Sequence, residues 1–177
     1  MLSAMEALER LKEGNHRYAT EDKRSDAVIN QIRRSEIASG QEPFAIILGC
    51  SDSRVPAEII FDQGLGDLFV IRVAGNIVAH SQIGSVEFAA DAFGTRLVVV
   101  MGHSNCGAVS ATLDQLARPL ENRSPNILAI VNRIRPSVEI LFQTAHREKP
   151  KDLVKLAVRA NVRASVNQLR NSSQLLE

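Results

Sequence analysis

Two short polar segments of the sequence contain the residue types that bind metal ions. Cys50 begins the first segment, Cys-Ser-Asp-Ser-Arg, and His103 and Cys106 lie in the second, Gly-His-Ser-Asn-Cys-Gly. Two thiolates and one imidazole suit zinc, and three protein ligands leave the fourth tetrahedral position open for water, as in catalytic zinc sites. Taken alone, these residues leave two alternatives open: buried thiols beside a hydrogen-bonded histidine, or a disulfide, which a reducing compartment disfavours.

An acid and a base follow the first of these candidate ligands. Asp52 lies two residues after Cys50, and Arg54 lies two residues after Asp52. Because two thiolates cancel the formal charge of zinc, water at the metal is acidified less than by imidazole ligands alone, and an oriented acceptor beside it becomes valuable. Asp52 could be that acceptor, and Arg54 could keep Asp52 ionised and away from the metal. An isolated Asp-x-Arg spacing usually indicates a surface ion pair, but its place between two candidate ligand segments favours the catalytic interpretation.

Both polar segments directly follow predicted strands. Short continuous apolar runs, typical of strands buried on both faces of a parallel sheet, occupy residues 44–48, 68–71 and 97–101. A helical spacing over residues 81–93, ended by Gly94, separates the last two. This alternation predicts an α/β fold with a mostly parallel central sheet flanked by helices. Ligands of such sheets bind at the carboxyl ends of the strands, so the two polar segments are expected to converge on one site.

The remaining segments are predicted to be mostly helical. Ser3 and Glu6 form a capping-box pattern in front of an apolar spacing, which predicts an N-terminal helix. A second helix is expected between Asp26 and Gly40. Three further helical segments are predicted at residues 113–117, 126–145 and 152–169, and Pro136 is expected to kink or split the middle one.

Length and composition exclude several classes of protein. With 177 residues, 45% of them hydrophobic and 23% charged, the chain fits one domain with a sizeable core. A net charge of +1, without a basic run interleaved with aromatic residues, argues against nucleic acid as a partner. No apolar run is long enough to span a membrane, and the N-terminus lacks a signal-peptide pattern. We therefore expect a cytoplasmic protein without a membrane partner, or a periplasmic one if a signal peptide has been removed.

The chain shows no internal repeat, low-complexity tract or long linker, which predicts a single domain over residues 1–177. Within it we expect an N-terminal helical arm (1–40), a sheet core carrying the zinc site (41–117) and C-terminal helices (118–177).

Three blocks of the sequence resemble the signature blocks of the beta-class carbonic anhydrases: residues 50–55, residues 102–107 and the intervening Phe-Val-Ile-Arg-Val-Ala-Gly-Asn at 69–76. The resemblance extends from about Glu6 to about Leu169. It implies reversible hydration of carbon dioxide to bicarbonate and a proton, with one zinc per chain on Cys50, His103 and Cys106 and an Asp52–Arg54 dyad beside it. It also implies a homodimer or higher homo-oligomer in which the N-terminal helices pack on the partner.

The same resemblance assigns residues to the substrate pocket. Gln41 would donate a hydrogen bond to substrate, Phe69 and Phe88 would line the apolar side, and the small residues of the pocket would be Ala74, Gly75 and Gly107. At Phe88 the plant-like branch of the family has a tyrosine. Ile47 stands where the branch regulated by bicarbonate has a tryptophan, and the chain contains no tryptophan. The resemblance is therefore to the plant-like branch, whose site is permanently open.

The resemblance leaves several points open. Family members usually continue past the last long helix into a further strand, whereas this sequence ends at Glu177, so a naturally short form and a truncated one are both compatible with it. Two other functions remain as alternatives: hydrolysis of carbon disulfide or carbonyl sulfide on the same zinc site, and a catalytically inert, zinc-stabilised assembly module. Parallel assays of both substrates and metal analysis would separate them.

Overall fold

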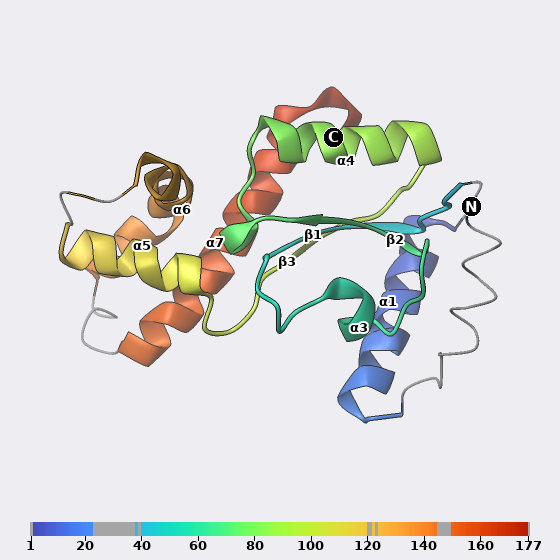
Figure 1. Cartoon of the computed structure of the whole chain (residues 1–177), viewed down its shortest axis with the longest axis horizontal. Coiled ribbons are helices and arrows are strands. Elements are labelled where there is room, and N and C mark those ends of the chain that lie inside the picture. The colour runs from blue at the N-terminus through green and yellow to red at the C-terminus, as the bar shows by residue number, and fades with distance from the viewer. Residues whose placement is uncertain are drawn as a thin grey trace.

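The chain forms a parallel sheet flanked by helices, which confirms the predicted α/β class (Figure 1). The computed structural model describes residues 2–22, 38, 40–119, 122, 124–144 and 150–176, so the helix predicted between Asp26 and Gly40 lies almost entirely outside the described residues. Within them, the strands are β1 (Ala45–Gly49), β2 (Leu68–Arg72) and β3 (Val98–Met101), in the order β2-β1-β3. Central β1 pairs in parallel with both neighbours.

The helices cover both faces of the sheet and one end of it. In chain order the described helical elements are α1 (Ala4–Ala19), α3 (Ala57–Ile60), η2 (Ala74–Asn76), α4 (His80–Phe93), α5 (Gly107–Ala117), α6 (Pro125–Gln143), α7 (Pro150–Ser172) and η4 (Gln174–Leu176). Helix α4 lies over one face, α1 and α3 lie over the other, and α5 and α6 lie beyond the carboxyl ends of the strands (Figure 1). Among the described helices, none combines the length and the apolar character needed to cross a membrane.

Strand β1 is the centre of the core. All five of its residues are buried. Ala45 and Ile47 pack on the face covered by α1, whereas Ile46 and Leu48 pack on the face covered by α4. Because successive side chains of a strand point to opposite faces, a strand buried on both faces must be apolar throughout, which explains its unbroken apolar run.

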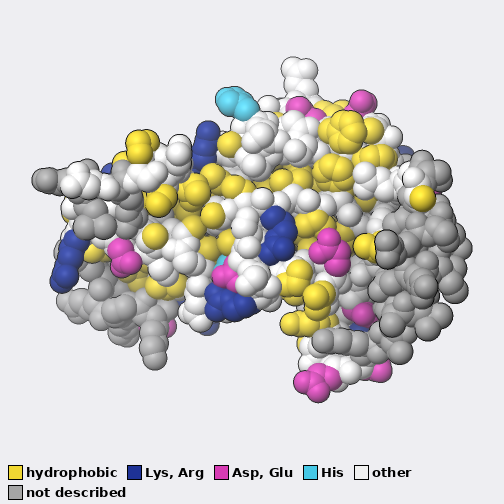
Figure 2. Space-filling view, in the orientation of Figure 1, with side chains coloured by type: hydrophobic (Ala, Val, Ile, Leu, Met, Phe, Trp, Pro, Cys, Tyr) yellow, Lys and Arg dark blue, Asp and Glu magenta, His cyan; other side chains and the backbone are white. Residues whose placement is uncertain are grey.

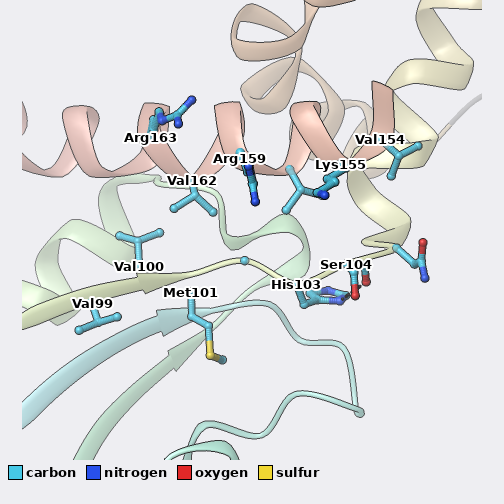
Figure 3. A pocket seen from close by; sticks show the side chains of 13 residues that line it. Val99, Val100, Met101, His103, Ser104, Val154, Lys155, Arg159, Val162 and Arg163 are labelled. Carbon is cyan, nitrogen blue, oxygen red and sulfur yellow. Dashed lines mark hydrogen bonds between the residues drawn. The ribbon is translucent and has the colours of Figure 1, made fainter. Parts of the chain in front are cut away.

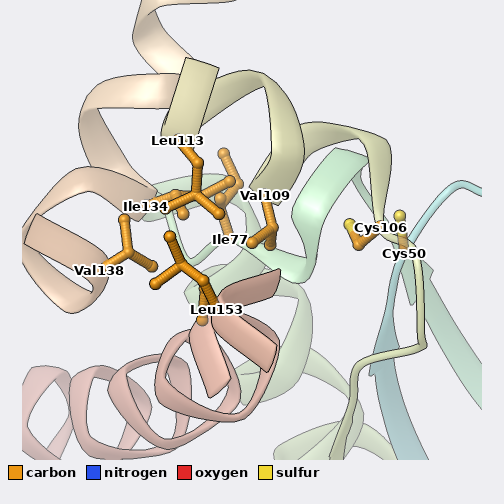
Figure 4. Close-up of a cluster of buried hydrophobic side chains, with 9 residues drawn as sticks. Cys50, Ile77, Cys106, Val109, Leu113, Ile134, Val138 and Leu153 are labelled. Atoms are coloured by element: carbon orange, nitrogen blue, oxygen red, sulfur yellow. The ribbon is translucent and has the colours of Figure 1, made fainter. Parts of the chain in front are cut away.

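A third hydrophobic cluster lies at the carboxyl end of the sheet, where α5, α6 and α7 pack together (Figure 4). Its buried members include Ile77, Val109, Leu113, Ile134, Val138 and Leu153. The side chains of Cys50 and Cys106 lie next to each other at the edge of this cluster (Figure 4). The packing of these helices therefore fixes the position of both cysteines.

Two local predictions can be compared directly with the structure. The capping box is confirmed, since Ser3 N–H donates to Glu6 Oε2 at 2.7 Å and Glu6 N–H donates to Ser3 Oγ at 3.3 Å. Of the kink or split predicted at Pro136, the split is wrong, because α6 continues through that residue as one helix, and the kink stays a prediction. Proline removes one hydrogen bond to the carbonyl of residue 132, but both positions are exposed, so water can satisfy that carbonyl.

Helix α7 runs along the edge strand β3, and a cavity of about 800 Å³ lies between them (Figure 3). Val158 and Val162 line its α7 side together with Arg159, and its far end reaches His103. Neither cysteine is among the described residues that line this cavity.

The contact between α1 and the loop after α3 can be tested at a glycine. A Cβ added to Gly14 would collide with the backbone carbonyl of Phe61, which cannot move as a side-chain end can. Gly14→Ala should therefore lower the free energy of unfolding by about 1–3 kcal/mol, the range for overpacked sites. Gly84→Ala, in α4 with nothing within 4 Å of the added Cβ, should instead raise it by about 0.5–1 kcal/mol. Denaturant unfolding of both variants measures this, and equal stability would mean that α1 does not pack here.

Candidate metal centre

Two neighbouring strands bring the two polar segments together. Cys50 directly follows β1, and His103 lies two residues after β3. Gly49 is paired with Met101, so these strands end at the same level and their following residues leave the sheet side by side. Cys106 is the N-cap residue of α5, which begins at this end of the sheet and lies beyond it (Figure 1).

Cys50, His103 and Cys106 form a cluster in which one ligand atom from each residue lies within 4.8 Å of the others. Both cysteines are buried and neither is in a disulfide. The disulfide alternative therefore does not describe this structure. Two sulfur atoms and one imidazole nitrogen at these separations fit the short bonds and tetrahedral geometry of a zinc site.

The orientation of His103 supports the same interpretation. Its Nδ1 lies 3.0 Å from the carbonyl oxygen of Ser104, which selects the tautomer with hydrogen on Nδ1. Nε2 is buried and has no hydrogen-bond partner among the described residues. A buried nitrogen lone pair without a partner costs free energy unless it binds something, and a metal ion would satisfy it.

Hydrogen bonds favour a thiolate at Cys50. The hydrogen bond from the Cys106 thiol holds the pKa of Cys50 well below its usual value, against the opposing effect of burial, and the N–H of Gly75, 3.3 Å from the sulfur, acts in the same direction. The same interaction with Cys50, together with burial, raises the pKa of Cys106. In metal-free protein we therefore expect the pair to share one negative charge.

Asp52 and Arg54 form a bidentate ion pair beside this cluster. Arg54 Nε donates to Oδ1 at 2.9 Å and Nη2 donates to Oδ2 at 2.7 Å, while the Arg54 backbone N–H adds a third bond at 3.0 Å. These hydrogen bonds from Arg54 hold the pKa of Asp52 well below its usual range. Oδ2 of Asp52 also lies 3.9 Å from Nε2 of His103, so the ionised carboxylate borders the cluster.

Arg72 is a site residue that the sequence analysis did not single out. From the end of β2, its Nε donates to the carbonyl oxygen of Cys50 at 3.0 Å and its Nη2 donates to that of Asp52 at 2.6 Å. Arg72 thereby ties the loop carrying the candidate ligand and the carboxylate to the neighbouring strand. The sequence feature that could have indicated this role is an arginine directly after the apolar run of residues 68–71.

The small residues assigned to the pocket differ in their surroundings. Gly75 is buried with its N–H directed at Cys50, whereas Ala74 beside it is half-buried. Gly107 is the exposed first residue of α5, next to Cys106. Gly75 and Gly107 border the cluster, and the contact of all three residues with substrate stays a prediction.

Phe69 and Phe88 do not reach the cluster of their own chain. Phe69 is paired with Ile46, four residues before Cys50, which places it roughly 13 Å back along the strand. Its ring contacts the rings of Phe88 and Phe93, with centroids 6.2 and 6.0 Å away. Phe88 is 57% exposed, and hydrophobic side chains gather over α4 on the face shown in Figure 2.

Gln41 also lies away from the cluster. It is exposed, four residues before β1, and therefore at the opposite end of that strand from Cys50. There it lines a cavity of about 630 Å³ together with Arg10 and Phe93. One chain thus brings together the candidate ligands and the acid–base pair but not Gln41 or the two aromatic residues.

Comparison with known proteins relates both the sequence and the fold to one family. Residues 45–177 match the family model described as carbonic anhydrase. The chain is 43% identical over 130 residues to carbonic anhydrase 2 of Mycobacterium tuberculosis, and 43% identical over 128 residues to a carbonic anhydrase of Mycolicibacterium smegmatis. Each match covers 72% of this chain and 61% of the relative, so the chain spans less than two thirds of these relatives.

Solved structures give the same result for the fold. The beta-carbonic anhydrase CcaA matches with a TM-score of 0.76 and 25% identity, over 96% of this chain and 75% of that one. A Coccomyxa beta-carbonic anhydrase in complex with acetazolamide matches with a TM-score of 0.73 and 27% identity, over 94% and 72% of the two chains.

The charge state of the cysteine pair can be tested in metal-free protein. Because the pKa of Cys50 is lowered and that of Cys106 is raised, one thiolate per chain should persist at neutral pH and survive mild acidification. Cys50→Ser should abolish the ultraviolet thiolate absorbance under these conditions. Cys106→Ser should keep it, because the serine hydroxyl can still donate to the Cys50 sulfur. Absorbance that titrates only near the ordinary thiol pKa of about 8.5 would contradict this arrangement.

Proposed function

This chain belongs to the carbonic anhydrase family, and we propose that it catalyses the zinc-dependent, reversible hydration of carbon dioxide to bicarbonate and a proton. The observation that carries the proposal is the cluster of Cys50, His103 and Cys106 with the ionised Asp52 beside it. A catalytic metal site needs an open coordination position and an oriented acceptor next to it, and this cluster supplies three ligands and one carboxylate.

Zinc is the proposed metal because the donor set is two sulfurs and one imidazole nitrogen. Cys50, Cys106 and Nε2 of His103 would hold it, and the hydrogen bond between Nδ1 and the Ser104 carbonyl would fix the ring that presents Nε2. When bound, zinc would supply Lewis acidity, which lowers the pKa of water so that hydroxide is available near neutral pH.

Asp52 is proposed to orient the attacking water. Both of its oxygens accept from Arg54, so the carboxylate is ionised and its direction is fixed. Asp52 can therefore accept a hydrogen bond from the water and direct the oxygen lone pair toward the carbon of carbon dioxide. Arg54 acts through Asp52: its positive charge offsets that of the ionised carboxylate, and the ion pair keeps the carboxylate from binding the metal.

A second copy of the chain is proposed to complete the substrate pocket. Gln41 and the aromatic cluster of Phe69, Phe88 and Phe93 lie away from the metal centre of their own chain, and Phe88 is exposed. A dimer that brings this surface onto the partner's metal centre would place apolar rings and an amide donor where carbon dioxide has to bind. The family resemblance implies a dimer of this kind, and the exposed aromatic surface supports it.

Metal content and carbon dioxide hydration test the proposed reaction together. Wild-type protein should hold about one zinc per chain, and Cys106→Ser should lose both zinc and activity. Asp52→Asn should keep zinc but hydrate carbon dioxide on the order of a hundredfold more slowly, because the amide cannot act as the proton acceptor. Elemental analysis and stopped-flow hydration measure these outcomes. Wild-type rates in Asp52→Asn, or activity without zinc, would refute the mechanism.

Mixing inactive variants tests the shared pocket. A Gln41→Ala chain and an Asp52→Asn chain should together give more activity than either alone, because one site of the hybrid dimer then has both residues intact. Asp52→Asn mixed with Arg54→Ala is the matched control, since both positions belong to the same chain's site and no intact site can form. A fully active monomer in light scattering, or equal rescue in both mixtures, would contradict the shared site.

A further inference from the structure

Helix α7 has a buried stripe that is only partly apolar. Leu153, Ala157, Asn161, Ser165 and Leu169 follow one another at intervals of four residues, and all five are buried. Residues at this spacing lie on one face of a helix, so a polar pair occupies the middle of an otherwise apolar face. Asn161 is 3% exposed and Ser165 is 4% exposed. Buried polar side chains are costly unless they are hydrogen-bonded, which raises the question of what this pair binds.

Both side chains bind the turn that follows β2. Asn161 Nδ2 donates to the carbonyl oxygen of Gly75 at 2.7 Å, and Ser165 Oγ donates to that of Asn76 at 2.9 Å. Gly75 and Asn76 both have left-handed backbone conformations, with φ of +70° and +43°. Two successive left-handed residues, one of them not glycine, are unfavourable unless their surroundings hold them in place.

The turn has no room to relax toward its other neighbours. A Cβ at Gly75 would lie 2.7 Å from Ile134 Cδ1 and 3.0 Å from the Cβ of Ala108, so α6 and α5 close two of its sides. Helix α7 also approaches the second ligand segment, because a Cβ at Gly102 would lie 2.5 Å from Val162 Cγ2. Helix α7 therefore packs against both the turn at Gly75 and Asn76 and the backbone at Gly102, the residue before His103.

The conformation of this turn determines a contact with a candidate metal ligand. Gly75 N–H points at Cys50 Sγ at 3.3 Å, in a buried position. A donor to a ligating thiolate stabilises its charge and fixes its orientation, and loss of such an outer contact typically weakens metal binding by about 10–100-fold. The N–H belongs to the same residue whose carbonyl Asn161 holds, so a rotation of this peptide segment would move both contacts.

We propose that Asn161 and Ser165 are positioning residues of the metal centre: by holding the turn at Gly75 and Asn76, they keep the Gly75 N–H on the Cys50 sulfur. They touch neither substrate nor metal and act only through the turn. The inference rests on the proposed metal centre, because Cys50 must be a ligand for its hydrogen bond to matter.

The test measures metal binding and the ligand field at sulfur, independently of activity. Asn161→Ala should lower zinc affinity by about tenfold or more in competition with a chromophoric chelator. In the cobalt(II)-loaded protein it should move the thiolate-to-metal charge-transfer band to longer wavelength, because a sulfur without its donor releases charge more easily. Ser165→Ala should do the same to a smaller extent, and Ser165→Thr, which keeps the hydroxyl, should restore the wild-type spectrum.

Leu169→Ala is the matched control. It removes a buried side chain from the same stripe of α7, but that side chain is apolar, belongs to the hydrophobic cluster of Ile46 and Leu48, and cannot hydrogen-bond to the turn. It should lower the unfolding temperature and leave the cobalt spectrum unchanged. Wild-type zinc affinity and spectrum in both alanine variants at 161 and 165 would overturn the inference alone. Failure of the wild-type chain to bind zinc or cobalt would overturn the proposed function and the inference together.

Discussion

The parallel pairing of β1 with β3 is the constraint on which the rest of the site depends. Cys50 and His103 are far apart in the sequence, and they meet because Gly49 and Met101 are partners at the ends of adjacent strands. That register is held by burial, since every residue of β1 is covered by helices on one face or the other. A shift by one residue would exchange the two faces of the strand and also separate the candidate ligands.

The structure also has to stabilise the negative charge of the cysteine pair and of Asp52 at a partly buried site. Two cysteine sulfurs and the Asp52 carboxylate lie close together, and their mutual repulsion would oppose folding if nothing offset it. Arg54 pairs with the carboxylate, and the N–H of Gly75 reaches the sulfur of Cys50. The N–H groups at the start of α5 lower the pKa of Cys106, against the larger effects of its partner thiol and of burial. A divalent cation would complete this balance, because both thiols could then ionise together.

The candidate site residues of one chain lie in separate places, which is the reason for proposing that a second chain completes the pocket. The candidate metal ligands and the Asp52–Arg54 pair belong to the carboxyl end of the sheet, whereas Gln41 lies at the opposite end. The aromatic cluster lies between β2, which carries Phe69, and α4, which carries Phe88 and Phe93. A hydrophobic surface of this kind has a physical reason to be covered. In the proposed dimer, a partner chain that covers this surface would gain burial and, in the same contact, would supply the apolar wall that the proposed substrate, carbon dioxide, needs.

The sequence by itself determined the α/β class, the strand positions, the N-terminal cap and the candidate metal ligands, because these are encoded locally in apolar periodicity and ligand spacing. It could not show that Arg72 holds the Cys50 loop, or that Asn161 and Ser165 hold the turn behind it, because those hydrogen bonds join segments far apart in the chain. It assigned Phe69 to the substrate pocket but could not show that strand register places this residue about four positions back from Cys50 of the same chain, so that its role stays a prediction that depends on a second chain. Contacts of this kind depend on strand order and helix packing. Only the tertiary structure decides which residues, distant in the sequence, come together.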